Sequence, residues 1–353
     1  MDKHRRSFIP GIAGAELGAL AYSSYRPILS AFGQTPAVAN GRLIDVHHHF
    51  VPPFYLSENR DRIAGASGGR MNPAWSNWTP AQAIAAMDEH GVGTAILSLT
   101  TPGTWFGDAK SASQTARRVN EYAADLGRSH PGRFGFFAAI PLPDTDSSLH
   151  EIDYSLGTLK ADGISLLTSY ADKWLGDSAY HSVFEELNRR KAVVFVHPTA
   201  PLCCRALLPD ISAAMIEIPQ DTTRAVTNLV FSGTLAKFRD IRFIFTHAGG
   251  NVPMVLGRMH QYAPKDYAEK VPDGIENELR CLYYDIAGTA YRPAIAALTS
   301  FVPSTQILFG SDHPFVPLAD TAERLPNLDL SAGDLQRIGR DNALALLPRL
   351  KTN

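Results

Sequence analysis

The sequence predicts a single α/β domain built as a (β/α)8 TIM barrel. Three observations predict it: eight short apolar runs recur along the chain, longer amphipathic runs separate them, and no shift in composition marks a second folded domain. The apolar runs are rich in Ile, Leu, Val and Phe and do not alternate with polar residues, as expected for parallel strands buried on both faces. Eight strands alternating with helices favour a closed barrel over a doubly wound open sheet, which is the alternative.

The elements are expected in the following order. Strands are predicted at Leu43–His47, Thr94–Leu99, Phe134–Ile140, Gly163–Leu167, Val193–His197, Arg242–His247, Leu282–Ile286 and Gln306–Phe309. Helices are predicted at Pro80–His90, Ser111–Ser129, Ser178–Arg190, Thr222–Phe238, Pro253–Tyr262 and Asp334–Leu347. A long connection over residues 50–78 follows the first strand, and in a barrel it would lie over the C-terminal face, where active sites are found.

The first 39 residues have the pattern of an export leader, which leaves residues 40–353 for the barrel. The stretch Arg5-Arg6-Ser7-Phe8-Ile9 resembles a twin-arginine signal, a mildly apolar run follows, and Ala37-Val38-Ala39 matches a small-residue cleavage site. Glu16 interrupts the apolar run, which is a departure from the pattern and argues against a stable membrane span. We therefore expect a periplasmic or exported protein; without a working leader it would be cytoplasmic.

Composition excludes several classes of protein. The chain has 353 residues, of which 45% are hydrophobic and 19% charged, so it can bury a large core. Its formal net charge of −2 lacks the basic excess typical of a nucleic-acid binder, and none is expected as a partner. Three cysteines do not make a disulfide framework. Histidine stands out instead, with twelve residues, three of them consecutive.

Five polar residues that can bind metals or transfer protons fall at the C-terminal ends of predicted strands. His47 and His49 end the first strand, His197 closes the fifth, His247 closes the sixth, and Asp312 follows the eighth. In a parallel barrel these ends share one mouth, so residues far apart in the sequence converge. A single histidine at a strand end is usually only hydrogen-bonded, but five such residues in one pattern indicate a functional site.

Three imidazoles and one carboxylate can bind a single divalent metal ion and leave a coordination position open for water or substrate. A nitrogen-rich set of ligands favours Zn²⁺, with Mn²⁺, Co²⁺ or Fe²⁺ as possible alternatives. The sequence therefore predicts one divalent ion per chain, most consistent with zinc.

At these residues the chain resembles the amidohydrolase superfamily, in the branch around 2-amino-3-carboxymuconate-semialdehyde decarboxylase. The matching motifs are Ile44-Asp45-Val46-His47-His48-His49-Phe50-Val51-Pro52, Val196-His197-Pro198, Thr246-His247-Ala248-Gly249-Gly250 and Gly310-Ser311-Asp312-His313-Pro314-Phe315. The resemblance extends over about Leu43 to Leu347, nearly all of the chain after the leader. The stretch from Met87 to Gly103 is most similar to salicylate-type members such as 6-methylsalicylate decarboxylase.

The resemblance implies a role for each residue. It assigns the metal four ligands: His47, His49, His197 and Asp312. It places His247 near the metal and substrate as an acid/base. Arg258 matches an arginine that reaches into the neighbouring subunit's active site and holds a substrate carboxylate, which implies a homodimer and a small-molecule carboxylic acid as substrate.

Two reactions suit this set of residues. In a non-oxidative decarboxylase of a salicylate-type or related unsaturated acid, the metal orients the substrate, CO₂ is released, and Asp312 or His247 delivers a proton to the ring carbon. In a hydrolase of a lactone, amide or ester, metal-bound hydroxide attacks an acyl carbon, with Asp312 or His247 as the base. The metal-binding residues alone do not separate these reactions. A non-catalytic metal-binding barrel is a third alternative, which the complete ligand set disfavours.

Overall fold

The computed structural model describes residues 42–66, 71–171, 173–201, 203–204, 207–208 and 210–351. The predicted leader, residues 1–39, lies outside the described residues. Across the part that is described, no helix has both the length and the apolar character needed to cross a membrane.

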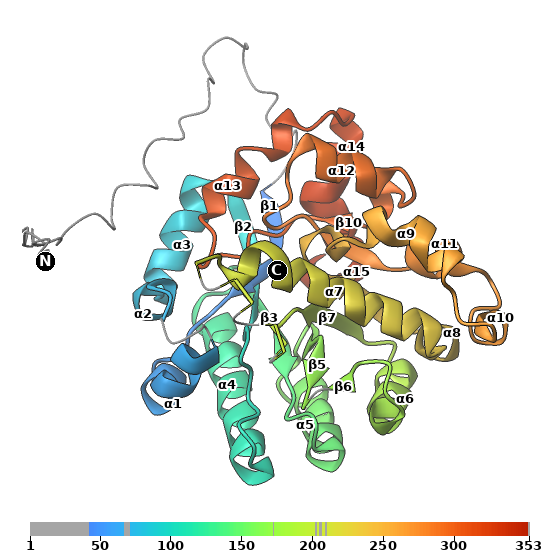
Figure 1. The fold of residues 1–353 in the computed structure, drawn as a ribbon. Coiled ribbons are helices and arrows are strands. Elements are labelled where there is room, and N and C mark those ends of the chain that lie inside the picture. Colours follow the sequence, from blue (N-terminus) through green and yellow to red (C-terminus); the bar gives the residue numbers. More distant parts are fainter. Residues whose placement is uncertain are drawn as a thin grey trace, which may run out of the picture. The chain divides into compact units, whose positions relative to one another are not determined.

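Eight parallel strands form the predicted barrel, in the order β1-β2-β3-β4-β7-β8-β9-β10 (Figure 1). They are β1 (Leu43–His49), β2 (Val92–Ser98), β3 (Phe134–Ala139), β4 (Gly163–Leu167), β7 (Val193–His197), β8 (Arg242–Phe245), β9 (Tyr283–Asp285) and β10 (Ile307–Leu308). Each coincides with a predicted strand, with ends that differ by a few residues. A small antiparallel hairpin, β5 (Ser169–Tyr170) and β6 (Lys173–Trp174), lies outside this sheet.

Backbone hydrogen bonds between the first strand and the chain after the last one join the two edges of the sheet. The Val46 N–H donates to the carbonyl oxygen of Phe309 at 3.0 Å, and the Asp312 N–H donates to that of His47 at 2.8 Å. The His49 N–H donates to the carbonyl oxygen of His313 at 2.7 Å. The segment that carries Asp312 is thereby attached directly to the strand that carries His47 and His49.

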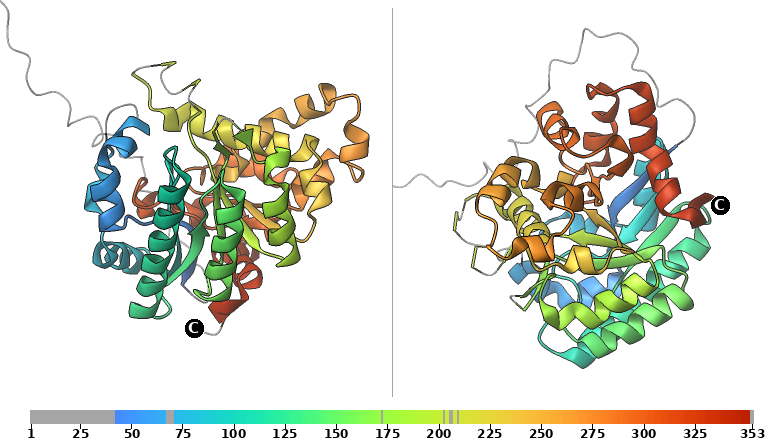
Figure 2. Two further views of the ribbon diagram at one scale, coloured as in Figure 1. Left: turned by 90° about the horizontal axis from the view of Figure 1, so that it is seen from below. Right: turned by 90° about the vertical axis from the view of Figure 1, so that its right-hand side faces the viewer.

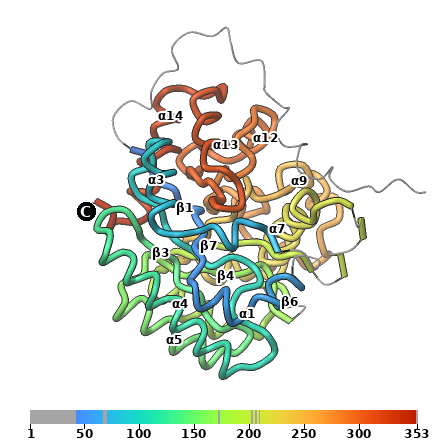
Figure 3. The backbone as a smooth tube through the Cα atoms, turned by 90° about the vertical axis from the view of Figure 1, so that its left-hand side faces the viewer, coloured from blue at the N-terminus to red at the C-terminus, as the bar shows by residue number. Residues whose placement is uncertain are grey.

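Helices surround the strands. They are α1 (Pro53–Ala66), α2 (Ala74–Asn77), α3 (Pro80–Glu89), α4 (Ala109–Ser129), α5 (Thr145–Gly157), α6 (His181–Arg189), α7 (Ala213–Phe231), α8 (Thr234–Lys237), α9 (Val252–Gln261), α10 (Tyr267–Lys270), α11 (Ile275–Arg280), α12 (Arg292–Thr299), α13 (Leu318–Ala322), α14 (Ala332–Gln336) and α15 (Asn342–Leu346). Short 3-10 turns occupy Ser178–Tyr180, His247–Gly249, Ser304–Gln306, Leu325–Asn327 and Pro348–Lys351, and a π-helical turn occupies Arg337–Asp341. Helices α4 and α5 lie side by side on the outside of the barrel (Figure 3).

The connection after β1 differs from the prediction, because it contains α1 and α2 rather than only a loop. Only Tyr55, Asn59 and Ile63 of α1 are buried, at positions i, i+4 and i+8, so the buried stripe is too narrow to give a strong helical pattern. Helix α7 also begins earlier than predicted and continues through Pro219. The predicted helices at 80–90, 111–129 and 253–262 are present with ends that shift by no more than two residues.

The interior of the barrel is filled by apolar side chains from alternate strand positions. Ile44 and Val46 of β1 belong to one cluster with residues of the other strands and with Leu346 and Leu350 from the C-terminal segment, red in Figure 2. The pairing of β1 with β2 shifts register between Asp45 and His48. Such an irregularity lets His47 and His49 face the interior although Val46 also does, which strict alternation along a strand would not allow.

Candidate metal centre

The ends of three strands bring four potential metal ligands together. His47 and His49 lie at the end of β1, His197 ends β7, and Asp312 follows β10. Ligand atoms of these residues all lie within 4.8 Å of one another. These are the residues to which the sequence resemblance assigns the metal, and the parallel direction of the strands explains why they meet.

The geometry of this group is compact. The Nε2 atoms of His47 and His49 are 3.1 Å apart. Oδ1 of Asp312 lies 3.3 Å from the first of these nitrogens and 3.1 Å from the second. The ring of His197 completes the group, with its centroid 5.2 Å from that of His47 and 4.7 Å from that of His49. All three histidines are buried.

The outward-facing nitrogen of each of these histidines already has an acceptor. Nδ1 of His47 donates to Oδ2 of Asp285 at 2.9 Å. Nδ1 of His49 donates to the carbonyl oxygen of Ser98 at 3.1 Å, and Nδ1 of His197 donates to that of Pro198 at 2.8 Å. Because carbonyl and carboxylate oxygens only accept, each ring carries a proton on Nδ1, and Nε2 is the nitrogen that can offer a lone pair to a metal at the centre.

Burial and charge set the protonation of the group. Burial lowers the pKa of His49, and it lowers the pKa of His197 well below the ordinary value, so both rings are neutral at pH 7. Burial also opposes a charge on His47, but Asp285 and Asp312 outweigh it and raise the pKa of His47 to about 10. The pKa of Asp312 lies well below its usual range, because contacts with His47 and His49 outweigh the effect of burial.

These observations fit a bound cation. The two Nε2 atoms that face each other at 3.1 Å need a positive charge between them, which a proton on His47 supplies without a metal and a divalent ion would supply in its place. Oδ1 of Asp312 is buried and has no hydrogen-bond partner, although it faces the two imidazoles. Three imidazole nitrogens and one carboxylate, with the outer nitrogens fixed by hydrogen bonds, are a suitable set of ligands for a divalent transition metal.

His247 lies beside this group rather than within it. It lies two residues after the end of β8, and its ring centroid is 5.0 Å from that of His47 and 5.8 Å from that of His197. Nδ1 of His247 donates to the carbonyl oxygen of Ala287 at 2.9 Å, which leaves Nε2 available. Its backbone has a φ of 55°, in the left-handed region that side chains other than glycine rarely adopt. Such conformations often mark functional positions.

Asp45 places Asp312, a role that was not predicted from the sequence. Asp45 is fully buried, and its Oδ1 accepts hydrogen bonds from the backbone N–H groups of His47 and Ser311 at 3.1 and 3.0 Å. Its Oδ2 accepts from the hydroxyl of Ser311 at 2.6 Å and from Nδ1 of His48 at 3.0 Å. These bonds hold the turn in which Asp312 has a φ of 64°. A carboxylate inside an apolar strand was the signal that could have revealed it.

Arg258 does not contact the four ligands in this chain. It lies on the exposed face of α9, with its guanidinium carbon 4.9 Å from the ring centroid of Tyr262. No acidic side chain of the described residues forms an ion pair with it. Its guanidinium is therefore accessible from outside the chain.

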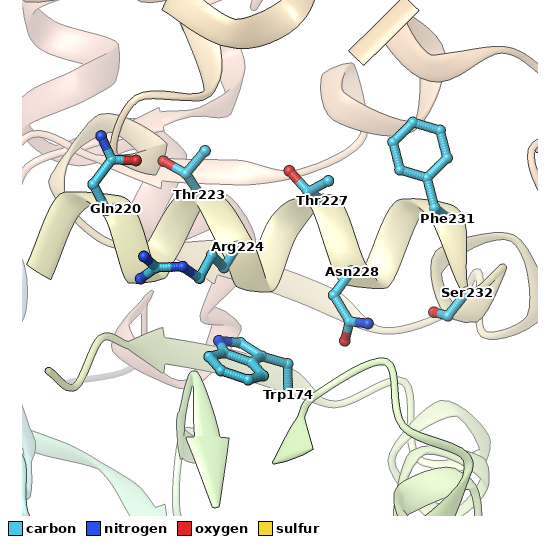
Figure 4. Close-up of a pocket in the computed structure, with 8 residues that line it drawn as sticks. All are labelled: Trp174, Gln220, Thr223, Arg224, Thr227, Asn228, Phe231 and Ser232. Atoms are coloured by element: carbon cyan, nitrogen blue, oxygen red, sulfur yellow. The ribbon is translucent and has the colours of Figure 1, made fainter. Parts of the chain in front are cut away.

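A groove on the outside of the protein lies away from this centre. It has a volume of about 530 Å³ and runs between α7 and the β5–β6 hairpin (Figure 4). Trp174 lines one side, and Arg224 and Asn228 are among the α7 residues on the other. None of the four clustered ligands lines it. We therefore place the candidate site at the histidine cluster and not at this groove.

Comparison with known proteins identifies the family. The family model described as amidohydrolase matches residues 44–349, nearly all of the described chain. The chain belongs to the amidohydrolase family. This finding agrees with the resemblance of the strand-end motifs.

Named relatives of this amidohydrolase include decarboxylases. The chain is 36% identical over 327 residues to decarboxylase yanB of Aspergillus niger, with 87% of this chain and 88% of that protein covered. It is 35% identical over 319 residues to 6-methylsalicylic acid decarboxylase of Penicillium expansum, with 87% and 97% covered.

Solved structures show the same fold. A crystal structure of an amidohydrolase II superposes with a TM-score of 0.80 at 27% identity, covering 87% of this chain and 99% of that one. A dihydroxybenzoic acid decarboxylase from Polaromonas, solved with bound manganese, superposes with a TM-score of 0.76 at 23% identity, covering 88% and 97%. The latter likeness shows the fold alone.

Proposed function

We propose that this amidohydrolase is a metal-dependent decarboxylase that releases CO₂ from a small aromatic carboxylic acid of the salicylate type. The observation that carries the proposal is the similarity, over almost the full length of both chains, to decarboxylases that include one named for 6-methylsalicylic acid. The compact group of three histidines and Asp312 supports it, because it gives this chain its own set of metal ligands.

His47, His49, His197 and Asp312 are the proposed ligands of one divalent ion. When bound, the ion would supply positive charge that orients the carboxylate and phenolate oxygens of the substrate. Zinc is the ion we propose from the nitrogen-rich ligands, and manganese, which one structural neighbour holds, is the alternative. Metal analysis of the purified protein, followed by reconstitution with each ion, tests the choice between them.

Proton delivery is the main chemical task of the side chains. When the bond between the ring carbon and the carboxylate breaks, its electron pair stays on the ring carbon, CO₂ departs, and that carbon takes up a proton. His247 and Asp312 are the proposed groups that hold and move this proton. His247 suits the task because Nδ1 is bonded to Ala287, while Nε2 remains available beside the ligands.

Aromatic side chains beside the ligands suit an aromatic substrate. The ring centroid of Phe315 lies 5.6 Å from that of His49, and the ring centroid of Trp75 lies 5.3 Å from that of Phe315. Phe315 is only partly buried and places apolar surface next to the proposed metal, whereas Trp75 is 3% exposed and packs behind it in the core. Phe50 is 1% exposed and stacks with Tyr122 in the core, so it does not line the site.

The reaction class is tested by measuring products. We expect CO₂ to form in step with loss of acid when metal-loaded protein is incubated with salicylate, 6-methylsalicylate and dihydroxybenzoates. A parallel panel of lactones, esters and amides should give no acid release. Hydrolysis of that second panel without any CO₂ from the first would contradict the proposal and favour a hydrolase.

We also propose that the protein is a homodimer in which Arg258 holds the substrate carboxylate in the partner's site. Apart from Tyr291, the strongly exposed large apolar side chains of the described residues lie in or next to α7 and α9. They are Leu207, Leu208, Ile211, Met215, Ile216, Met254 and Tyr262. The two helices contact each other, so these side chains and Arg258 occupy neighbouring surface. Exposed apolar side chains that gather on and beside two contacting helices are typical of a protein interface.

Mixing two inactive variants tests both parts of this proposal. Arg258→Ala and His197→Ala chains should each be inactive alone, and their mixture should regain activity, because one site of a mixed dimer has intact ligands and an intact partner arginine.

Arg258→Lys should weaken substrate binding with metal content unchanged, since lysine cannot pair with a carboxylate through two parallel hydrogen bonds. Unchanged kinetics in Arg258→Ala would remove Arg258 from the site.

Export is the last proposal from the sequence: residues 1–39 direct the chain through the twin-arginine route, which transports folded proteins. A fusion of residues 1–45 to a folded reporter should reach the periplasm, and replacing both Arg5 and Arg6 with lysine should block it. A reporter that stays in the cytoplasm with the intact leader would overturn the proposal.

A further inference from the structure

Asp285 is a buried carboxylate that touches two residues of the site without facing the proposed metal. It ends β9 and is fully buried. Its Oδ2 accepts the hydrogen bond from Nδ1 of His47 at 2.9 Å. Its Oδ1 accepts from the backbone N–H groups of His247 and Ala287, each at 3.0 Å.

These contacts use both carboxylate oxygens. Asp285, His47 and His247 also have potential ligand atoms within 4.8 Å of one another, so they could be taken for a second metal site. However, the nitrogen of His47 that faces Asp285 is Nδ1, and the nitrogen that faces His49 and Asp312 is Nε2. Asp285 therefore lies on the side of the His47 ring that faces away from His49 and Asp312.

Close packing holds this arrangement in place. A side-chain carbon added at Gly310 would come within 2.8 Å of Cβ of His47 and 3.0 Å of Cβ of Asp285. The backbone of Gly310 therefore packs closely against both residues and leaves no space for a side chain of its own. Oδ1 of Asp285 also accepts the hydrogen bond from the backbone N–H of His247. The φ of His247 is 55°, a strained conformation that persists only where surrounding contacts stabilise it.

We propose that Asp285 is a positioning residue that determines which nitrogen of His47 is offered to the metal and at the same time fixes the backbone of His247. This inference rests on the proposed metal site and deepens it. A carboxylate behind a ligand imidazole keeps the proton on the outer nitrogen and orients the ring. One side chain thereby links a ligand to the proposed proton-transfer residue.

Asp285→Asn gives a sharp test, because asparagine has nearly the same shape but different hydrogen bonding. Its single oxygen can satisfy the N–H groups of His247 and Ala287, and its NH₂ group then faces Nδ1 of His47. That NH₂ only donates, so His47 must accept at Nδ1 and carry its proton on Nε2. The lone pair for the metal is lost, and we expect metal affinity to fall about 10- to 100-fold.

The comparison with alanine separates positioning from packing. If Asp285 only fills space, Asp285→Asn should bind metal as tightly as the wild type, and Asp285→Ala should bind it more weakly. If it controls the tautomer, asparagine should reduce metal affinity at least as much as alanine. Glu151→Gln is the matched control, because Glu151 is also a buried carboxylate, bonded to Arg117 and Asn120 between helices away from the ligands. It should leave metal affinity unchanged.

Metal affinity is measured by competition with a coloured chelator, and folding by far-ultraviolet circular dichroism of metal-free protein. Wild-type affinity in Asp285→Asn, or an equal loss in Glu151→Gln, would overturn the proposal. Should neither Asp285 variant fold, NMR of histidine-labelled wild-type protein decides instead. We expect a slowly exchanging Nδ1–H signal that disappears in His47→Ala, and its absence from the wild type would refute the role of Asp285. These readouts involve no substrate, so a failure of the decarboxylase proposal would leave them intact.

Discussion

Replacing His197 with alanine is expected to abolish both metal binding and turnover. The change removes one of three buried nitrogens that face Asp312, and no other described histidine belongs to that group of four. His47→Ala should behave in the same way, because its Nε2 lies within 3.3 Å of both His49 and Asp312. Wild-type protein should contain about one divalent ion per chain, as expected for a site with this number of ligands.

Elemental analysis and CO₂ release, measured on the same preparations, check this expectation. His150→Ala serves as the matched control, because His150 is exposed on α5, outside both the ligand group and the proposed dimer surface. It should keep both metal and activity. A metal-free His197→Ala preparation that still releases CO₂ at the wild-type rate would rule out the proposed mechanism.

The position of the ligands could be predicted from sequence because it depends on strand ends. Each of His47, His49 and His197 terminates an apolar run, and a parallel barrel brings such ends together whatever the details of the helices. The eight strands were predictable because continuous apolar runs are a strong local signal. Helices α1, α2 and α5 were not predicted, because they bury few apolar residues: three of the four buried positions of α5 are the polar residues Ser148, Glu151 and Ser155.

The supporting carboxylates depend on tertiary structure and are harder to predict. Asp45 places the turn before Asp312 through bonds that span 266 residues of sequence, and Asp285 reaches His47 across 238 residues. A carboxylate inside an apolar strand marks Asp45 as unusual, but no local pattern specifies its distant partner. The register shift in β1 is equally hidden, yet it decides which face of the strand His47 occupies. Sequence thus predicted which residues meet, whereas the structure was needed to see what orients them.

His247→Ala is expected to keep its metal and lose turnover, by about 10²-fold or more for a missing proton-transfer group. The reason lies in the geometry: His247 stands beside the four ligands and is held by Asp285 and Ala287, so the ligands do not depend on its ring. The loss should appear in kcat, because proton delivery to the ring carbon belongs to the chemical step.

A second substitution separates chemistry from backbone strain at this position. His247 has a φ of 55°, which alanine tolerates poorly and asparagine tolerates better, so His247→Asn should remain closer to wild-type stability. Both variants lack an imidazole, and a proton-transfer role therefore predicts a similar loss of kcat in each. Recovery of activity in His247→Asn would assign the defect of the alanine variant to the backbone. If metal content falls together with activity in both, His247 is a ligand, and the division of the site into four ligands and one acid/base is wrong.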